Sequence, residues 1–260
     1  MDLELAGKRV IVTGGTRGLG WAIAERLARE GCAVALCARD RAEVDARTNR
    51  LSALGVGAHG AVVDVADAAA LEPFIEHAAD AFGGLDLLVA NAGGHEGGPT
   101  LADADPQAWR RTVDLNLIHA AVAARAAAPL MRDHGGGAIV FITSISGQRP
   151  QPSARYATAK AAEIHLAACL GRELGPDGIR VNALSPGSIL FEGGGWDRRR
   201  AADPERFQQW VREEFPLGRL GSPEEVADVA CFLLSPRANW ISGSNVVVDG
   251  AQNAPTMSGW

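Results

Sequence analysis

Short runs of β-branched residues alternate with longer Ala- and Leu-rich stretches along almost the whole chain. Seven of the short runs are strongly apolar: 8–13, 33–37, 60–64, 85–91, 138–143, 179–185 and 245–249. The stretches between them are long enough for helices, which we expect at 18–30, 40–54, 67–82, from 106 onward, 155–174 and 223–234. This alternation is typical of successive βαβ units, whose strands are apolar on both sides because helices cover both faces. We therefore predict an α/β protein with a doubly wound, seven-stranded parallel sheet and helices on both faces.

The domain organisation follows from the regularity of this pattern. No internal repeat or linker interrupts the 260 residues, so we expect a single domain over 1–260. Residues 187–218 break the rhythm between the sixth strand and the next helix. Long insertions in compact domains are often functional lids, and we expect this one to be a substrate loop. Its aromatic residues either cover an apolar substrate or pack in a core or interface: Phe191, Trp196, Trp210 and Phe215.

Composition excludes several classes of protein. A net charge of -6 argues against general nucleic-acid binding, and Arg198–Arg200 is the one compact basic run. No basic region precedes an apolar stretch near the start, and no run approaches a membrane span. We expect a cytoplasmic protein with no membrane partner. The four cysteines, Cys32, Cys37, Cys169 and Cys231, lack metal-ligand spacing, so we expect neither a zinc site nor a disulfide.

A glycine-rich segment, "TGGTRGLG" at 13–20, follows the first strand directly and opens a helix. Glycines in this context allow close approach of backbone amides to a pyrophosphate at a helix N-terminus, as in the Rossmann-type dinucleotide fold. An acidic residue at the end of the second strand would favour NAD, but Ala38 stands there, followed by Arg39. With Arg17 in the glycine loop, this favours NADP(H), while NAD(H) stays open. Asp40 has capping-box spacing to Glu43, which gives it a structural role.

Several polar residues fall where the predicted strands end. Asp64, Asn91, Ser144 and the "SPGS" at 185–188 follow strands, and Asn116 and Tyr156 lie on the helices after the fourth and fifth strands. Ligands of open parallel sheets bind beyond the carboxyl ends of the strands. We therefore expect one cleft to collect all of these residues.

"RYATAK" at 155–160 contains the only tyrosine of the chain and one of its two lysines. On a helix, Tyr156 and Lys160 are i and i+4 and share one face. A free phenol ionises only near pH ~10, but a nearby ammonium stabilises the phenolate. A compact ammonium with three donors can also hold a ribose hydroxyl, which a planar guanidinium does less well. This pair predicts acid/base chemistry at a hydroxyl or carbonyl group.

Taken together, these motifs resemble those of the classical short-chain dehydrogenase/reductase family almost from end to end. The resemblance rests on "TGGTRGLG", Asp64, "NAG" at 91–93, Asn116, Ser144, "YATAK" at 156–160, "PG" at 186–187 and "VVVDGA" at 246–251. It implies four catalytic residues: Asn116, Ser144, Tyr156 and Lys160. It also implies a set of cofactor-binding residues: Gly14, Thr16, Arg17, Gly18, Leu19, Gly20, Ala38, Arg39, Asp64, Val65, Asn91, Ala92, Gly93, Tyr156, Lys160, Pro186, Gly187 and Ile189.

The resemblance further implies a role for each catalytic residue. Tyr156 would exchange a proton with the substrate oxygen, Ser144 would hydrogen-bond the same oxygen, and Lys160 would assist the phenol and hold the nicotinamide ribose. Asn116 would help to hold a water-linked proton relay. Ser146 is an alternative to Ser144, and His95, after "NAGG", either contacts substrate or is solvated. Members of the family are commonly homotetramers or homodimers, and Trp260 could pack on a neighbouring subunit.

We expect an NADP(H)-preferring oxidoreductase acting on CH–OH groups, which interconverts a ketone and a secondary alcohol. The 3-oxoacyl thioesters handled by 3-oxoacyl-ACP reductase-like members are one candidate substrate. The alternatives are an NAD-dependent sugar or polyol dehydrogenase and a catalytically idle NADP-binding regulator. Arg198–Arg200 either grips an anionic substrate tail or forms a solvated charge run.

Overall fold

The sheet is seven-stranded, with the order β3-β2-β1-β4-β5-β6-β7 and parallel pairing throughout. The computed structural model describes residues 2–94, 97–98, 100–150 and 153–252. Its strands are β1 (Arg9–Thr13), β2 (Ala33–Ala38), β3 (Ala58–Val62), β4 (Leu87–Ala90), β5 (Gly137–Ile142), β6 (Ile179–Pro186) and β7 (Asn245–Val248). The predicted fold class is confirmed. The largest displacement is at β3, which begins two residues before the predicted run, so Asp64 stands two residues beyond its end.

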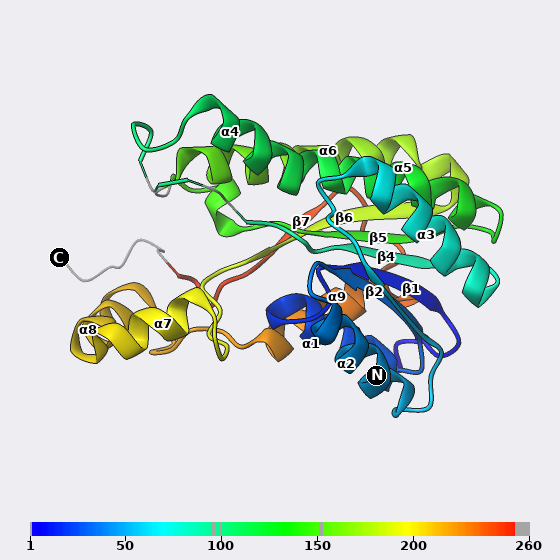
Figure 1. The fold of residues 1–260 in the computed structure, drawn as a ribbon, viewed down its shortest axis with the longest axis horizontal. Helices are drawn as coiled ribbons and strands as arrows, with labels where there is room; N and C mark the ends of the chain where they lie inside the picture. The colour runs from blue at the N-terminus through cyan, green and yellow to red at the C-terminus, as the bar shows by residue number, and fades with distance from the viewer. Residues whose placement is uncertain (1, 95–96, 99, 151–152, 253–260) are drawn as a thin grey trace.

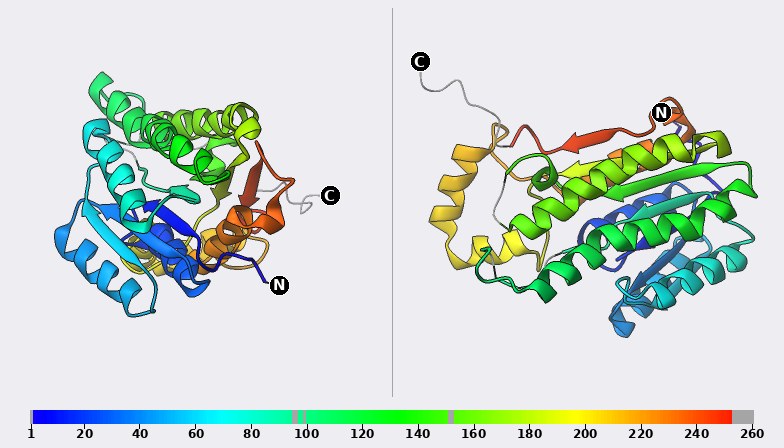
Figure 2. Two further views of the ribbon diagram at one scale, coloured as in Figure 1. Left: turned by 90° about the vertical axis from the view of Figure 1, so that its right-hand side faces the viewer. Right: turned by 90° about the horizontal axis from the view of Figure 1, so that it is seen from above.

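Helices cover both faces of this sheet (Figure 1; Figure 2, left). They are α1 (Gly18–Arg29), α2 (Arg41–Ser52), α3 (Ala68–Phe82), α4 (Pro106–Val113), α5 (His119–Arg132), α6 (Ala154–Glu173), α7 (Gly195–Ala202), α8 (Pro204–Glu214) and α9 (Pro223–Leu234). Helices α3, α5 and α6 enclose one apolar core and α1, α2 and α9 the other. Within the described ranges, no helix is long and apolar enough to cross a membrane.

Local capping explains why most helices begin where the sequence predicts. The side chains of Asp40, Asp67 and Asp105 each accept a hydrogen bond from an amide in the first turn that follows. Ser222 and Glu225 form a complete capping box at α9. Such caps satisfy amides that the helix itself leaves without partners. The Asp40 box is only half formed, because Glu43 turns away to accept from the Thr16 hydroxyl at 2.9 Å.

The helix expected from residue 106 onward is interrupted at the site. A π-helical turn, η1 (Asp114–Ile118), separates α4 from α5 and contains Asn116. The Asn116 amide nitrogen donates to the carbonyls of Thr112 and Gly94, both at 2.7 Å. Insertions of this kind are common at functional sites and widen the helix locally. The widened turn directs a fully buried Asn116 side chain toward the loop after β4.

The inserted segment forms two helices, α7 and α8, beyond one end of the sheet (Figures 1 and 2). They pack on a small apolar cluster of their own, which consists of Phe207, Val211, Phe215 and Leu220 with Leu190, Trp196 and Trp210 around them. The rings of Trp196 and Trp210 stack at 4.3 Å. Three of the four aromatic residues proposed as a lid therefore pack in this cluster. Phe191 alone of the four faces the cleft described below.

Candidate active site

A cleft of about 650 Å³ lies at the carboxyl edge of the sheet. The predicted cofactor residues that line it are Gly14, Thr16, Arg17, Gly18, Leu19, Gly20, Ala38, Arg39, Asp64, Val65, Asn91, Ala92, Gly93 and Tyr156. They come from the ends of β1, β2, β3 and β4 and from α6. The parallel topology thus brings together residues that are far apart in the sequence.

The glycine loop is held in a compact shape by close backbone contacts and by the Asn91 side chain. A Cβ on Gly20 would lie 2.2 Å from the Gly14 carbonyl oxygen, so only glycine allows α1 to begin this close to β1. The Asn91 amide donates to the carbonyls of Thr13 and Gly14, at 2.9 and 3.1 Å, and fixes the loop after β4 beside it. A pyrophosphate fits this arrangement, because the N-terminus of α1 opens into the cleft.

Two arginines lie in the part of the cleft formed by the glycine loop and the end of β2. Arg17 and Arg39 are exposed, line the cleft and make no ion pair with any described residue. Asp40, their acidic neighbour, accepts from the Glu43 amide at 3.0 Å and is directed at the helix. Arg47 reaches the same loop, where its Nε donates to the Thr16 carbonyl at 2.9 Å and its guanidinium lies over the Trp21 ring.

Tyr156 and Lys160 lie on one face of α6, as the spacing predicts. Tyr156 is half-buried and lines the cleft, whereas Lys160 is 2% exposed and lies behind Gly93. A Cβ on Gly93 would be 2.8 Å from Asn116 Oδ1 and 3.2 Å from Lys160 Nζ. Because Gly93 lines the cleft, both polar groups lie close to the cleft wall, and Asn116 also accepts from the Gly94 amide.

Ser144 lies directly after β5 and begins a short 3-10 helix, Ile145–Gly147. It is half-buried, and its hydroxyl accepts a hydrogen bond from the Ser146 amide at 3.1 Å. Ser144 therefore still has its own proton to donate. The choice between Ser144 and Ser146 stays a prediction.

The remaining predicted site residues either do not line the cleft or lie outside the residues that the structure describes. Asn116, Ser144 and Lys160 do not line the cleft, so the expectation that one cleft collects all of the predicted residues is met only in part. Pro186, Gly187 and Ile189 do not line it either. Their turn is fixed from behind, where the Gly187 amide donates to Val248 and the Ser188 amide to Gln252 Oε1, at 2.9 and 2.7 Å. His95 and Trp260 lie outside the described residues.

Two features of the site, Glu163 and Arg155, were missed from the sequence, whereas the segment from Phe191 to Arg198 was expected as part of a substrate loop. Glu163 is fully buried beside Lys160, with Oε2 2.7 Å from Nζ. The segment from Phe191 to Arg198 closes one side of the cleft, and the Phe191 ring packs on Gly18. Arg155 is 1% exposed and donates to the carbonyls of Gly97 and Gly98. A signal was present for Glu163, which stands three residues after Lys160 on the same helical face.

Electrostatics around Lys160 are dominated by burial and by its carboxylate partner. Burial alone lowers the pKa of the Lys160 ammonium, but the negative charge of Glu163 and the Tyr156 oxygen oppose this, and the net pKa is raised. Burial raises the pKa of the Glu163 carboxyl, against the influence of Lys160. On α5, burial and the Lys160 charge lower the pKa of His119 to about 3, so its imidazole is neutral.

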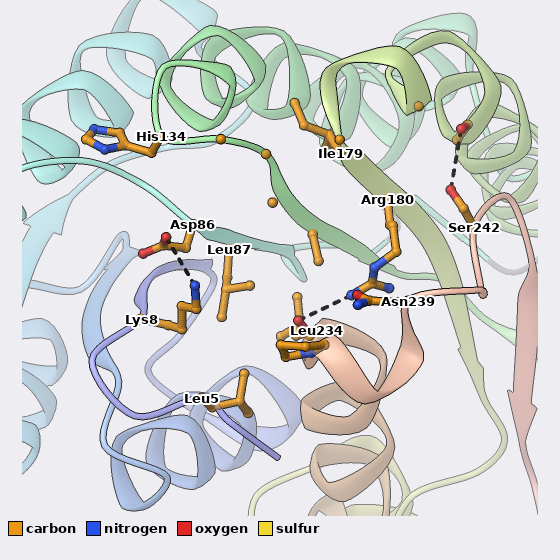
Figure 3. Close-up of a pocket in the computed structure, with 18 of the residues that line it drawn as sticks. Leu5, Lys8, Asp86, Leu87, His134, Ile179, Arg180, Leu234, Asn239 and Ser242 are labelled. Atoms are coloured by element: carbon orange, nitrogen blue, oxygen red, sulfur yellow. Dashed lines mark hydrogen bonds and ion pairs between the residues drawn. The ribbon is translucent and has the colours of Figure 1, made fainter.

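A second cavity, of about 640 Å³, lies at the opposite edge of the sheet (Figure 3). Lys8 and Asp86 form an ion pair there at 3.8 Å. Arg180 donates to the carbonyls of Leu233 and Ser235, at 2.8 and 3.0 Å, and so secures the end of α9. Because the polar groups of this cavity are used in holding strand and helix ends, it is not the candidate active site. Among the described residues, no group of three His, Cys, Asp or Glu side chains could hold a metal ion.

Comparison with known proteins agrees with this geometry. A family model described as enoyl-(acyl carrier protein) reductase matches residues 14–252. Isoepoxydon dehydrogenase patN of Penicillium expansum is 35% identical over 262 residues, covering 97% of each chain. The human dehydrogenase/reductase SDR family member 4 is 35% identical over 247 residues, covering 95% of this chain and 87% of its own. The structure of L-sorbose reductase from Gluconobacter frateurii with NADPH and L-sorbose superposes with a TM-score of 0.91 at 33% identity, covering 98% and 100% of the two chains.

Fold, cleft and similarity together define an oxidoreductase built on a dinucleotide-binding sheet. The chain belongs to the short-chain dehydrogenase/reductase family, as the sequence motifs indicated. It is thus a nicotinamide-dependent dehydrogenase/reductase that acts on CH–OH groups.

Proposed function

We propose that this protein reduces a small to medium ketone with NADPH, or oxidises the matching secondary alcohol in the reverse direction. The observation that carries the proposal is the Tyr156 side chain, which lines the same cleft as the glycine loop while Lys160 lies behind it. A proton-transfer group and a dinucleotide site then meet in one cleft. This is the arrangement that a carbonyl reductase needs.

The chain's own residues supply the proton chemistry. Tyr156 donates its hydroxyl proton to the carbonyl oxygen during reduction and accepts it back during oxidation. Ser144 donates a hydrogen bond to the same oxygen, and Lys160 stabilises the phenolate that remains. Asn116 keeps the loop after β4 in place through Gly94 and would help to hold the water-linked proton relay. When bound, the nicotinamide cofactor supplies or accepts the hydride at the substrate carbon.

The preference for NADP(H) rests on the adenosine end of the cleft. Arg17 and Arg39 form no ion pair with a carboxylate of the described residues, and guanidinium groups bind phosphate with charge-assisted, often bidentate hydrogen bonds. Among similar structures, L-sorbose reductase carries NADPH, whereas a 7α-hydroxysteroid dehydrogenase that is 32% identical, with a TM-score of 0.88, carries NADH. Overall similarity therefore does not decide the cofactor, and the two arginines support NADP(H).

Substrate identity depends on the segment 187–218, which we propose as the substrate loop. Two relatives, an isoepoxydon dehydrogenase and a 3alpha-hydroxysteroid dehydrogenase, are named for different substrates, so overall similarity does not decide which substrate this chain takes. The likeness to L-sorbose reductase supports a second candidate, a sugar or polyol dehydrogenase. A 3-oxoacyl thioester stays a third candidate, supported by the family model.

A substrate screen tests this function. Ketones, ketoses and 3-oxoacyl thioesters are offered with NADPH, and secondary alcohols and polyols with NADP+, while absorbance of the reduced cofactor is followed. We expect turnover with at least one ketone class. Tight cofactor binding without any turnover would instead support an idle regulator, and turnover with polyols and NAD+ alone would support the second candidate.

We also propose that the protein is a homo-oligomer, either a tetramer or a dimer. Most soluble oligomers consist of identical chains arranged with closed symmetry, and dimers and tetramers are common among them. The Trp240 side chain lines the second cavity and is fully exposed, so it is available to pack on a neighbouring subunit. Light scattering on the full chain measures the state directly.

A further inference from the structure

Glu43 is a carboxylate in the cofactor cleft that the function proposed above does not use. It stands in the first turn of α2, is exposed, and lines the cleft together with Arg17 and Arg39. A carboxylate is an unexpected neighbour for two arginines that are proposed to bind a phosphate, because two negative charges repel each other. Its effect on the cofactor therefore needs an explanation.

Two hydrogen bonds place Glu43 between the segments that carry the two arginines. Its Oε2 accepts from the Thr16 hydroxyl at 2.9 Å, and Thr16 directly precedes Arg17 in the glycine loop. Its backbone amide donates to Asp40 Oδ1 at 3.0 Å, and Asp40 directly follows Arg39. Glu43 thus contacts the chain neighbour of each arginine, so it lies where the glycine loop meets the end of β2.

The hydroxyl that Glu43 binds belongs to a well-fixed residue. Thr16 is 3% exposed, and its carbonyl accepts a 2.9 Å hydrogen bond from Nε of Arg47. Glu43 and Arg47 are i and i+4 on α2, so both reach the glycine loop from one face of that helix. The Arg47 guanidinium also lies over the ring of Trp21 on α1, at 4.5 Å. The hydrogen bond to Thr16 therefore holds the carboxylate at the loop instead of leaving it extended into solvent.

The charge of this carboxylate is not neutralised by a local ion pair. Glu43 forms none with any residue in the described ranges. Asp40 and Asp64 accept backbone amides, at 3.0 and 3.1 Å, whereas Glu43 accepts from a hydroxyl. The charged side chains that line the cleft are Arg17, Arg39, Arg198, Asp40, Glu43 and Asp64. Cations and carboxylates are thus equal in number there.

We propose, building on the NADP(H) preference proposed above, that Glu43 is a specificity-determining residue that opposes the 2′-phosphate and so limits the preference for NADPH that Arg17 and Arg39 create. A phosphate group carries a charge of about −1.5 to −2 at pH 7, so a carboxylate held beside its site weakens its binding. NADH has a hydroxyl at that position, which can donate a hydrogen bond to a carboxylate. The charge of Glu43 therefore does not oppose NADH.

Binding of the two cofactors tests this role without any substrate or turnover. Calorimetry gives the dissociation constants of NADPH and NADH at pH 7 for the wild type and for Glu43→Gln. The substitution removes the charge but keeps the size of the side chain and an oxygen that accepts from Thr16. We expect the dissociation constant of NADPH to fall by about two- to fivefold, as for one exposed charge contact, while that of NADH changes by less than about 1.5-fold.

Two further variants separate this role from a general effect of net charge. Asp45→Asn makes the same change of charge on the same helix, but Asp45 does not line the cleft, so the ratio of the two constants should stay unchanged. Glu43→Lys should favour NADPH further, by a similar factor again, and 0.5 M salt should reduce both gains. An unchanged or reduced affinity of Glu43→Gln for NADPH, or an equal gain for NADPH and NADH, would overturn the inference.

The two proposals fail in different ways. If no ketone or alcohol reacts but Glu43→Gln binds NADPH more tightly as expected, the proposed activity is wrong while the role of Glu43 stands. If ketones are reduced with NADPH but the two dissociation constants do not separate in Glu43→Gln, only the role of Glu43 is wrong.

Discussion

His119 is a buried residue of α5 that supports the loop after β4. Its Nε2 lies 2.9 Å from the Thr13 hydroxyl, which also accepts from the amides of Asn91 and Ala92, at 3.0 and 3.2 Å. Because that oxygen accepts twice, its one proton goes to Nε2, and the imidazole is neutral with Nδ1 protonated. The side chain thereby supports two residues that line the cleft.

This environment predicts a specific pH dependence of stability. The pKa of His119 is lowered from 6.5 to about 3, first by burial and then by the Lys160 charge. The contribution of His119 to the free energy of unfolding is complete above pH 6.5 and is lost as the pH falls toward 3. In this range the imidazole takes up a proton in the unfolded chain but not in the folded one. Between pH 7 and 5, we expect the wild type to lose about 2 kcal/mol more unfolding free energy than His119→Gln does. Urea unfolding at both pH values measures this, and equal losses would contradict it.

Arg39 should decide between the two cofactors. We expect Arg39→Ala to lower the ratio of kcat/KM for NADPH to that for NADH by about 10- to 100-fold, because a charge-assisted contact with the 2′-phosphate is worth about 1.5–3 kcal/mol. Arg41→Ala is the matched control, since Arg41 does not line the cleft and lies near Asp45. An unchanged ratio in Arg39→Ala would remove the argument for this residue.

At the scale of elements, the arginine run at the end of α7 divides into three environments. Arg198 lines the cleft, Arg199 stacks on Trp196 at 4.5 Å, and Arg200 pairs with Asp197 at 2.7 Å. The sequence left two interpretations of this run open, binding of an anionic substrate tail and a solvated run of charges. Neither interpretation describes all three residues. Position along one short helix thus determines which of the three arginines lines the cleft.

Arg198 should therefore contribute to binding the part of the dinucleotide that NADPH and NADH have in common. It lies in the segment whose Phe191 packs on Gly18 of the glycine loop. We expect Arg198→Gln to raise the dissociation constants of NADPH and NADH by a similar factor, about 3- to 10-fold, through loss of one partly exposed charge contact. Calorimetry measures both constants, with Arg199→Gln as the control. If only the affinity for NADPH fell, Arg198 would instead contact the 2′-phosphate.

The sequence predicted those elements whose signals are local. Strand positions followed from apolar runs, and helix starts from caps such as Asp105 and Ser222, because both depend on near neighbours. The π-turn at Asn116 was not predictable in this way, since it depends on bonds to Gly94, which is distant in sequence. The helices α7 and α8 were missed because their apolar residues pack on one another rather than on the sheet.

At the scale of the whole molecule, the site follows from topology. A parallel sheet places the ends of β1, β2, β3 and β4 along one edge, so residues as distant as Gly14 and Tyr156 line one cleft. The rule for strand ends found Asp64 and Asn91 without any knowledge of contacts, but it also placed Ser144, Asn116 and residues 185–188 in the cleft, whose lining does not include them. It could not find Glu163, whose importance depends on the burial of its partner, or Arg198, which depends on how the inserted segment folds back over the cleft.

The most direct test of the account is a comparison of turnover and cofactor binding in Tyr156→Phe, once a substrate is known. The substitution removes one hydroxyl and leaves the ring and the glycine loop in place. We predict that kcat falls by about 100- to 10,000-fold, as expected for loss of a general acid. The dissociation constant for NADPH should change by less than about threefold, since this proton is not needed to bind the dinucleotide. Turnover near the wild-type rate in this variant would contradict the central claim.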